Sequence, residues 1–343
     1  MPTKGNIELD VGVKSFATGL LPELIAGLRR CRRGDLMAVV GSEADLGVEL
    51  ERWCRFTGNT LVDTTVEAGR TRWVIRCGEV PAGVDTKRRV GSRLWLYTNF
   101  HCNLHCDYCC VRSSPQVARR ELGLARVQRI ASEAVELGVD EIFVTGGEPF
   151  LLAGIGEILT ACAAAAPTTV LTNGMLLPRR LETLRSLPID RITLQISLDS
   201  PTPDRHDQHR GKGTWVSAWK GIELARSEGF RVRLASTVST DLEAEEFRHF
   251  LDSHQISEEN RVIRRIALRG FALDGVALAR ADLVPEITIT ADGVYWHPVG
   301  AGDADMLVTP DIFPLAESFA AVRGAFERES AHRHRLAKIF NCA

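Results

Sequence analysis

The chain contains no long uninterrupted apolar segment and carries almost no net charge. Of its 343 residues, 45% are hydrophobic and 25% are charged, with a formal net charge of −2. A membrane-spanning helix needs about 20 consecutive apolar residues, and binding to nucleic acid usually goes with a marked excess of basic residues. We therefore expect neither a membrane-spanning nor a nucleic-acid-binding protein.

Signals for export and for disulfide stabilisation are also lacking. Residues Met1–Glu8 have no apolar core of the kind found in secretory signals. Nine cysteines in a chain without such a signal indicate free thiols and metal ligands rather than a disulfide framework. We expect a cytoplasmic protein with two or three domains.

Three cysteines, in contrast, are concentrated in one short stretch. Cys102, Cys106 and Cys109 form a C-x3-C-x2-C run directly after a strand-like segment, Arg93–Tyr97. Cysteine is the usual ligand of iron–sulfur clusters, and three thiolates can hold three corners of one cube. No fourth cysteine follows at ferredoxin spacing, which leaves one iron open to a ligand that is not protein.

A structural zinc site is the alternative interpretation of this run. Zinc takes four nitrogen or sulfur ligands, and His101, His105 or Cys110 would have to complete the set. Only one C-x2-C pair is present, however, and zinc leaves the motifs downstream unexplained. We favour the cluster and expect Cys110 to pack as a small buried residue.

With Tyr108 in its aromatic position, the run resembles the C-x3-C-x-aromatic-C signature of the radical S-adenosylmethionine (radical SAM) superfamily. About forty residues later, Thr145–Pro149 resembles the Gly-Gly-Glu-Pro motif of the same superfamily. The resemblance implies two cofactors, a [4Fe-4S] cluster held by Cys102, Cys106 and Cys109, and S-adenosylmethionine (SAM). Because Cys342 stands alone in the tail, we predict a single cluster.

The resemblance also assigns SAM-binding roles to residues at strand ends. Glycines 146 and 147 let backbone approach a ligand closely, and Glu148 supplies a carboxylate for the methionine ammonium group. The predicted SAM-binding residues are Tyr108, Gly146, Gly147, Glu148, Pro149, Asn173, Ser197, Asp199 and Arg264. Turn formation is an open alternative for Asn173, Ser197 and Asp199, and a surface ion pair is one for Arg264. No catalytic residue is assigned.

From residue 92 onward, strand patterns alternate with helix patterns, which predicts an α/β protein with a parallel sheet. The predicted strands are Arg93–Thr98, Glu141–Thr145, Thr168–Thr172, Arg191–Ser197, Arg231–Val238 and Arg261–Ala267. The predicted helices are Leu124–Leu137, Gly154–Ala165, Arg179–Ser186, Trp215–Glu228 and Leu242–Ser253. The resemblance implies that these units form a partial (β/α)6 barrel of the TIM type. We expect residues 204–213 to be a structural loop, with Arg210 near the substrate, and Arg269 to be a second cation available for a carboxylate.

Residues 1–80 are predicted to form a separate domain with the order β-α-β-α-β-β. Leu9-Asp10, the Arg33–Asp35 turn and the segment Trp53–Gly58 resemble the TusA-like sulfur-carrier family. That family carries sulfur on a Cys-Pro pair before its first helix, but the matching stretch, Lys14–Pro22, has no cysteine. We therefore interpret the domain as a degenerate relative that docks or presents a substrate, and expect Cys54 to be structural.

The rest of the chain divides by composition. Residues 81–92 are predicted to be a linker, residues 93–285 the radical SAM core, and residues 286–343 a C-terminal extension. Ala291-Asp-Gly293 is typical of a hairpin turn, and a last helix is expected over Leu315–Phe340.

The resemblance implies that reduction of SAM at the cluster produces a 5′-deoxyadenosyl radical, which abstracts hydrogen from a substrate. An external electron donor, a ferredoxin or a flavodoxin, is implied as a partner. The substrate stays open. The TusA-like domain favours sulfur-related, cofactor or natural-product chemistry. One alternative is a maturase that modifies a peptide recognised by the N-terminal domain, and another is a non-enzymatic iron–sulfur protein that relays sulfur or binds a partner.

Overall fold

The computed structural model describes residues 7–16, 20–28, 30–31, 34–43, 46–57, 59–67, 69–78 and 89–339. The chain divides into two compact units, Met1–Arg88 with Ser330–Ala343, and Arg89–Glu329. Residues 81–88 of the predicted linker and Cys342 lie outside the described residues.

The N-terminal unit has the predicted order of elements. They are β1 (Ile7–Gly12), α1 (Leu20–Leu28), β2 (Leu36–Gly41), α2 (Leu46–Thr57), β3 (Thr60–Glu67) and β4 (Arg70–Arg76). The strands form one sheet in the order β1-β2-β4-β3, in which only β1 and β2 are parallel. Apolar side chains of both helices, among them Leu24 and Leu50, pack with Val39 and Ile75 of the sheet in a common core. The predicted β-α-β-α-β-β order is confirmed.

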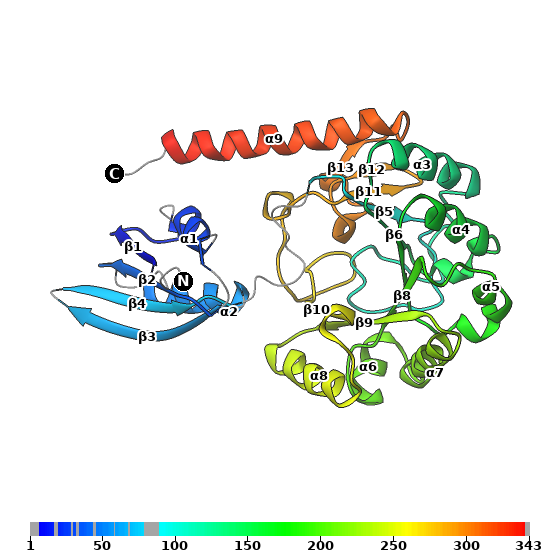
Figure 1. Cartoon of the computed structure of the whole chain (residues 1–343), viewed down its shortest axis with the longest axis horizontal. Helices are drawn as coiled ribbons and strands as arrows, with labels where there is room; N and C mark the ends of the chain where they lie inside the picture. The colour runs from blue at the N-terminus through cyan, green and yellow to red at the C-terminus, as the bar shows by residue number, and fades with distance from the viewer. Residues whose placement is uncertain are drawn as a thin grey trace, which may run out of the picture. The chain divides into compact units, whose positions relative to one another are not determined.

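The larger unit is built on a nine-stranded sheet with the order β10-β9-β8-β7-β6-β5-β11-β12-β13. Strands β5 to β10 are parallel, and each lies within two residues of its predicted bounds. They are β5 (Arg93–Tyr97), β6 (Glu141–Thr145), β7 (Thr168–Thr172), β8 (Ile192–Ser197), β9 (Arg231–Val238) and β10 (Arg261–Arg265). In Figure 1 the helices of this unit lie outside the curved row of strands, as in a partial TIM-type barrel.

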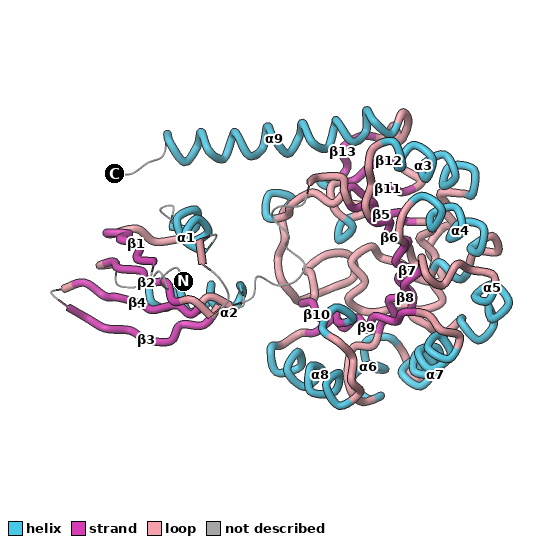
Figure 2. Tube along the Cα trace, viewed as in Figure 1, coloured by secondary structure: helices cyan, strands magenta, loops and turns pink. Residues whose placement is uncertain are grey.

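Alternation of side chains along the strands explains this layering. Leu94, Leu96, Ile142 and Val144 are fully buried and pack against the surrounding helices, while the residues between them point to the other face. The helices are α3 (Leu124–Glu136), α4 (Ile155–Ala165), α5 (Leu181–Arg185), α6 (Pro203–Arg210), α7 (Thr214–Ser227) and α8 (Asp241–Ser253). Short 3-10 turns are η1 (Pro149–Leu151), η2 (Leu177–Arg180), η3 (Glu258–Asn260), η4 (Arg280–Asp282), η5 (Pro298–Gly300) and η6 (Ala304–Met306). Figure 2 shows the strands as an arc with the helices on its convex side.

One prediction for local structure was wrong. The segment 204–213 is not a loop, because α6 occupies most of it. Its residues are polar on every side, so the sequence lacks the apolar periodicity that would predict a helix. Pro203 opens the helix at its first turn and Gly211, with φ of 110°, ends it. The helix predicted over 179–186 is present as α5 and is preceded by the 3-10 turn η2.

The C-terminal hairpin was predicted correctly but extends the sheet of the barrel. Strands β11 (Ile287–Thr290) and β12 (Gly293–Tyr295) are antiparallel, and β11 also pairs in parallel with β5. A third strand, β13 (Leu307–Thr309), was not predicted, and α9 (Leu315–Ile339) follows. Within the described ranges, no helix combines the length and apolarity needed to cross a bilayer.

Candidate functional site

The three cysteines lie on residues 98–114, which we call the cysteine loop and which follow β5. Cys102 is buried, and Cys106 and Cys109 are half-buried. The amide of Leu104 donates to Cys102 Sγ over 3.4 Å, and the amide of Ser113 donates to Cys109 Sγ over 3.3 Å. Hydrogen bonds of this kind stabilise thiolates and tune iron–sulfur clusters. The donor set therefore fits the predicted cluster.

Burial raises the pKa of Cys102 to about 12 and that of Cys106 to about 11. Only thiolates ligate metal, so both thiols need nearby positive charge to ionise. Irons of a cluster would supply that charge. In the part of the chain that the structure describes, no three His, Cys, Asp or Glu side chains converge on one position for a single metal ion.

The cysteine loop packs directly on the Thr145–Pro149 motif. The amide of Gly147 donates to the carbonyl of Asn99 over 3.0 Å, and the amide of Glu148 donates to the carbonyl of His101 over 3.1 Å. A Cβ on Gly147 would lie 2.1 Å from the His101 oxygen, and one on Gly146 would lie 2.5 Å from the Asn99 oxygen. We predicted the glycines for close approach of a ligand. In the structure, the space beside them is filled by the cysteine loop.

Glu148 is completely buried beneath this contact. One carboxylate oxygen accepts from the Phe150 amide (3.0 Å) and the Thr172 hydroxyl (2.8 Å), and the other accepts from the Asn173 amide (2.8 Å). Burial raises the pKa of Glu148, and these hydrogen bonds oppose the rise. A carboxylate offers about four acceptor positions, and three of them are occupied here.

Asn173 joins the end of β7 to the cysteine loop. Its side-chain amide donates to the Asn103 side-chain oxygen over 2.9 Å, and its own oxygen accepts from the Met175 amide over 3.0 Å. The turn role that we left open for Asn173 is therefore present, together with a direct link to the residue after Cys102.

A buried ion pair fastens the other side of the loop. Arg210 donates from Nε to Asp199 over 2.6 Å, and the Tyr108 hydroxyl and the Thr237 amide (3.1 Å) donate to the same carboxylate. The side chains of Arg210 and Asp199 are only 9% and 2% exposed, so this pair is shielded from solvent. Burial disfavours the charged form of Asp199, but the charge and hydrogen bonds of Arg210, together with the hydrogen bond from Tyr108, lower the pKa of this carboxyl. The charge of Arg210 also opposes the rise in the pKa of Cys106.

The remaining predicted SAM-binding residues surround this arrangement. Pro149 begins η1 and is buried, and Ser197 ends β8 half-buried. Arg264 is exposed and donates to the Thr237 hydroxyl over 3.4 Å. The structure holds no SAM, so the predicted contacts of all nine residues with SAM stay predictions.

Arg269 belongs to an ion-pair network. It lies 2.8 Å from both Asp303 and Asp305, and it also donates to the Leu278 carbonyl over 2.8 Å. Arg269, which we predicted to be a cation available for a carboxylate, is thus paired with two carboxylates of the chain itself.

Sequence reasoning did not assign a structural role to three residues that hold the site together. Asn103 lies inside the cysteine motif, and Arg210 was considered only for a contact with the substrate. Gly270, which follows β10 with φ of 66°, would place a Cβ 2.1 Å from the Cys109 carbonyl. The amide of Phe271 donates to that same carbonyl over 3.0 Å. The sequence signal for Gly270 was a glycine after the sixth strand. The sequence could not show that it packs on Cys109, which lies 161 residues earlier in the chain.

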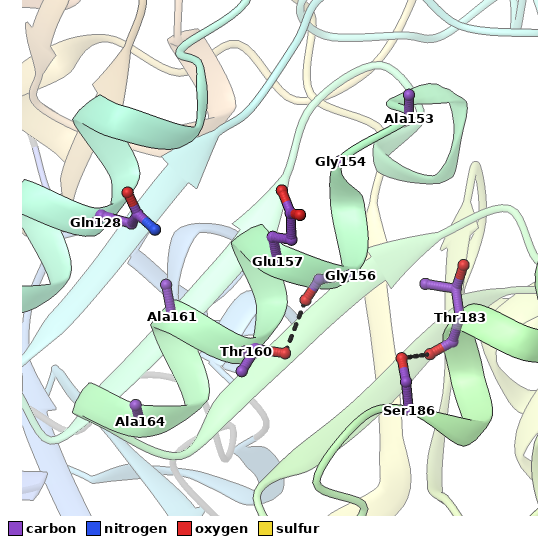
Figure 3. Close-up of a pocket in the computed structure, with 10 residues that line it drawn as sticks. All are labelled: Gln128, Ala153, Gly154, Gly156, Glu157, Thr160, Ala161, Ala164, Thr183 and Ser186. Carbon is purple, nitrogen blue, oxygen red and sulfur yellow. Dashed lines mark hydrogen bonds between the residues drawn. The ribbon is translucent and has the colours of Figure 1, made fainter.

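A surface pocket of about 570 Å³ lies elsewhere on this unit. Figure 3 shows that it is lined by small residues of α4, such as Gly156 and Ala161, with Gln128 of α3 and Thr183 of α5. These helices pack on the outer side of the sheet, away from the cysteine loop. The pocket has no titratable cluster, and we assign it no role.

The buried His206 predicts a pH dependence of stability. Its Nδ1 accepts from the Asp199 amide over 3.1 Å, and burial lowers the pKa of His206 to about 4. Between pH 4 and 6.5 the unfolded chain binds a proton that the folded chain does not, so stability falls with falling pH in this window. The loss is on the order of 3 kcal/mol.

Urea unfolding of the apoprotein at several pH values tests this prediction. We expect the slope between pH 6.5 and 4 to be smaller in His206→Gln than in the wild type, whereas His249→Gln, at an exposed position on α8, should keep it. Equal slopes in all three proteins would show that His206 titrates normally.

Comparisons with known proteins agree with the fold and the motifs. Residues 96–253 match the Radical SAM superfamily. A GTP 3′,8-cyclase of Pelotomaculum thermopropionicum is 31% identical over 161 residues, which cover 45% of this chain and 48% of that protein. The antilisterial bacteriocin subtilosin biosynthesis protein AlbA of Bacillus subtilis is 36% identical over 140 residues, 40% of this chain and 31% of AlbA. The chain thus spans half or less of the length of these relatives.

The solved structure of native anSMEcpe with bound AdoMet shares the fold. It superimposes with a TM-score of 0.53 and 13% identity, over 68% of this chain and 82% of that one. Fold and motifs together define a protein with a partial TIM-type barrel and a cysteine loop at the end of its first strand. Residues 96–253 of this chain form a domain of the radical SAM superfamily. Members of that superfamily are enzymes that use an iron–sulfur cluster and SAM and need a reductant.

Proposed function

We propose that this protein is a radical SAM enzyme with one [4Fe-4S] cluster held by Cys102, Cys106 and Cys109. The observation that carries the proposal is the cysteine loop, which contacts residues that follow β6, β7, β8 and β10 through hydrogen bonds between positions distant in sequence. When bound, the cluster and SAM would supply the electron and the carbon radical that abstracts hydrogen from a substrate.

The chain's own residues would bind and shield these cofactors. Glu148 retains an acceptor position for the methionine ammonium group. Arg210 places a buried positive charge beside Cys106, which favours its thiolate form. Tyr108 and Asn173 hold the loop, through Asp199 and Asn103, over the strand ends, where a closed site excludes water.

We infer a small molecule or a peptide as the substrate, and a ferredoxin or a flavodoxin as the electron donor. The names of two relatives support the two substrate classes, since one is a GTP 3′,8-cyclase and the other acts in bacteriocin biosynthesis. The N-terminal unit, with its predicted likeness to TusA-like carriers, would present or recognise the substrate.

Anaerobic reconstitution tests the proposal. The protein is loaded with iron and sulfide, reduced with dithionite and given SAM, and 5′-deoxyadenosine is measured by chromatography. We expect its formation by the wild type and by Cys110→Ala, but only background amounts from Cys106→Ala.

Two results would contradict the proposal. A protein that binds iron and sulfide but releases no 5′-deoxyadenosine above the Cys106→Ala level would favour the non-enzymatic iron–sulfur protein. If Cys110→Ala lost 5′-deoxyadenosine formation to the same extent as Cys106→Ala, the assignment of the cluster to Cys102, Cys106 and Cys109 would be wrong.

A further inference from the structure

Two polar side chains of neighbouring strands lie next to each other on the concave face of the barrel sheet. Gln195 of β8 and Arg233 of β9 are partners in the strand register. Leu194 and Leu234, their neighbours along the chain, pack in the core shared with the helices, which lie on the convex side of the strands (Figure 2). Because successive side chains of a strand point to opposite faces, Gln195 and Arg233 point to the concave side.

The protein itself leaves both side chains without a partner. Gln195 is only 4% exposed, and no hydrogen bond joins its carboxamide group to any residue that the structure describes. Nε of Arg233 is buried and donates to no atom, and the same described ranges contain no ion pair with its guanidinium group. Buried polar groups of native proteins are nearly always hydrogen-bonded, so these two side chains indicate a polar partner that comes from outside the chain.

The carboxylates on the same side of the barrel interact with other residues. Glu141 lies 3.4 Å and Glu286 3.7 Å from the guanidinium group of Arg93. Glu286 also accepts a hydrogen bond from the indole of Trp95. Burial lowers the pKa of Arg233, although the negative charge of Glu141 acts in the opposite direction. Arg233 is therefore a buried cation for which the chain supplies no paired anion.

We propose that Gln195 and Arg233 bind a carboxylate group of the substrate. A guanidinium group can donate two parallel hydrogen bonds to a carboxylate, and the carboxamide of Gln195 adds a neutral donor beside it. The pair carries a single positive charge, which matches a carboxylate better than a doubly charged phosphate. This inference rests on the proposed function, because it names a chemical feature of the substrate of that reaction.

The position of the pair also orients the substrate. Ser197, where β8 ends, points to the same face as Gln195 and lies about 7 Å further along the strand. The cysteine loop packs beyond these strand ends. A substrate held by its carboxylate at Gln195 and Arg233 therefore extends toward the cysteine loop. An analogue without the carboxylate would leave both donors unpaired, so the pair also selects among substrates.

The test measures the binding of two probes to the full-length chain at constant ionic strength by ligand-observed saturation-transfer NMR. Sodium acetate stands for a free organic acid, and a tripeptide with blocked ends and a central glutamate stands for an acidic side chain. We expect saturable binding of at least one probe, and the probe that binds more tightly identifies the source of the carboxylate. Arg233→Met should weaken this binding at least about tenfold, because hydrogen bonds to a charged group are lost.

Two further variants control for folding and for charge. Gln195→Leu should also weaken binding, and it decides the question if Arg233→Met does not fold. Arg231→Met is the matched control, because Arg231 is an exposed arginine two residues earlier on β9 whose Nε donates to the Asn260 side chain over 2.9 Å. It should bind the probes as the wild type does.

Three results would overturn the proposal. They are no saturable binding of either probe, equal affinities of the wild type and Arg233→Met, and equal weakening by Arg231→Met and Arg233→Met. Inorganic phosphate that binds more tightly than both probes, and loses this binding in Arg233→Met, would overturn the choice of a carboxylate. The measurement needs neither cluster nor SAM, so its outcome is independent of the 5′-deoxyadenosine assay that decides the proposed function.

Discussion

Replacing Asp199 by alanine is expected to destabilise the barrel by about 3–5 kcal/mol. The substitution removes the carboxylate that accepts from Arg210, Tyr108 and Thr237 and leaves the Arg210 guanidinium buried without its partner. Breaking a buried pair by removing one partner has a cost of this size because the remaining charge is still desolvated. Denaturant unfolding of the apoprotein, followed by tryptophan fluorescence, measures the change.

Asp204 provides the matched control, because it is an exposed carboxylate in the first turn of α6, the helix that also carries Arg210. Asp204→Ala should change the unfolding free energy by less than about 1 kcal/mol. The double variant Asp199→Leu/Arg210→Met should lose less unfolding free energy than the two single variants lose together, since both charges are then absent. Equal effects of Asp199→Ala and Asp204→Ala would mean that the Asp199–Arg210 pair is solvated in solution.

Replacing Gly147 by alanine is expected to displace the cysteine loop and abolish cluster assembly. The new Cβ would lie 2.1 Å from the His101 carbonyl oxygen, a backbone atom that cannot turn aside as a side chain can. Relief of the clash has to separate the amide of Gly147 from the Asn99 carbonyl, and with it the loop that carries Cys102. The cluster absorbance and the iron content after anaerobic reconstitution report this loss.

Gly154, seven residues further on, is the control for the effect of an added methyl group. It precedes α4 with φ of −88°, and a Cβ there would approach no atom closer than 3.6 Å. Gly154→Ala should therefore bind iron as the wild type does and cost at most about 1 kcal/mol in stability. A Gly147→Ala protein with full iron content would show that the cysteine loop and the Thr145–Pro149 motif are not in contact in solution.

Much of the barrel could be predicted from the sequence because its signals are local. Alternating apolar runs mark each strand, as in Arg231–Val238, and a turn signal such as Ala291-Asp-Gly293 marks a hairpin. The cysteine motif is equally local, since its three thiols lie within eight residues. Helix α6 and strand β13 were missed for the complementary reason. Neither the polar helix nor the three-residue strand has an apolar period of its own.

By itself, then, the sequence predicted which cysteines could hold a cluster and that a parallel α/β sheet would carry them, because spacing and periodicity are properties of short segments. The barrel was implied by the resemblance to the radical SAM superfamily. Only the tertiary structure decided how that loop is held: Gly147 against His101, Asn173 beside Asn103, and Arg210 paired with Asp199. These contacts join residues 11 to 70 positions apart. They form because parallel strands bring their carboxyl ends, and the loops that follow them, to one edge of the sheet.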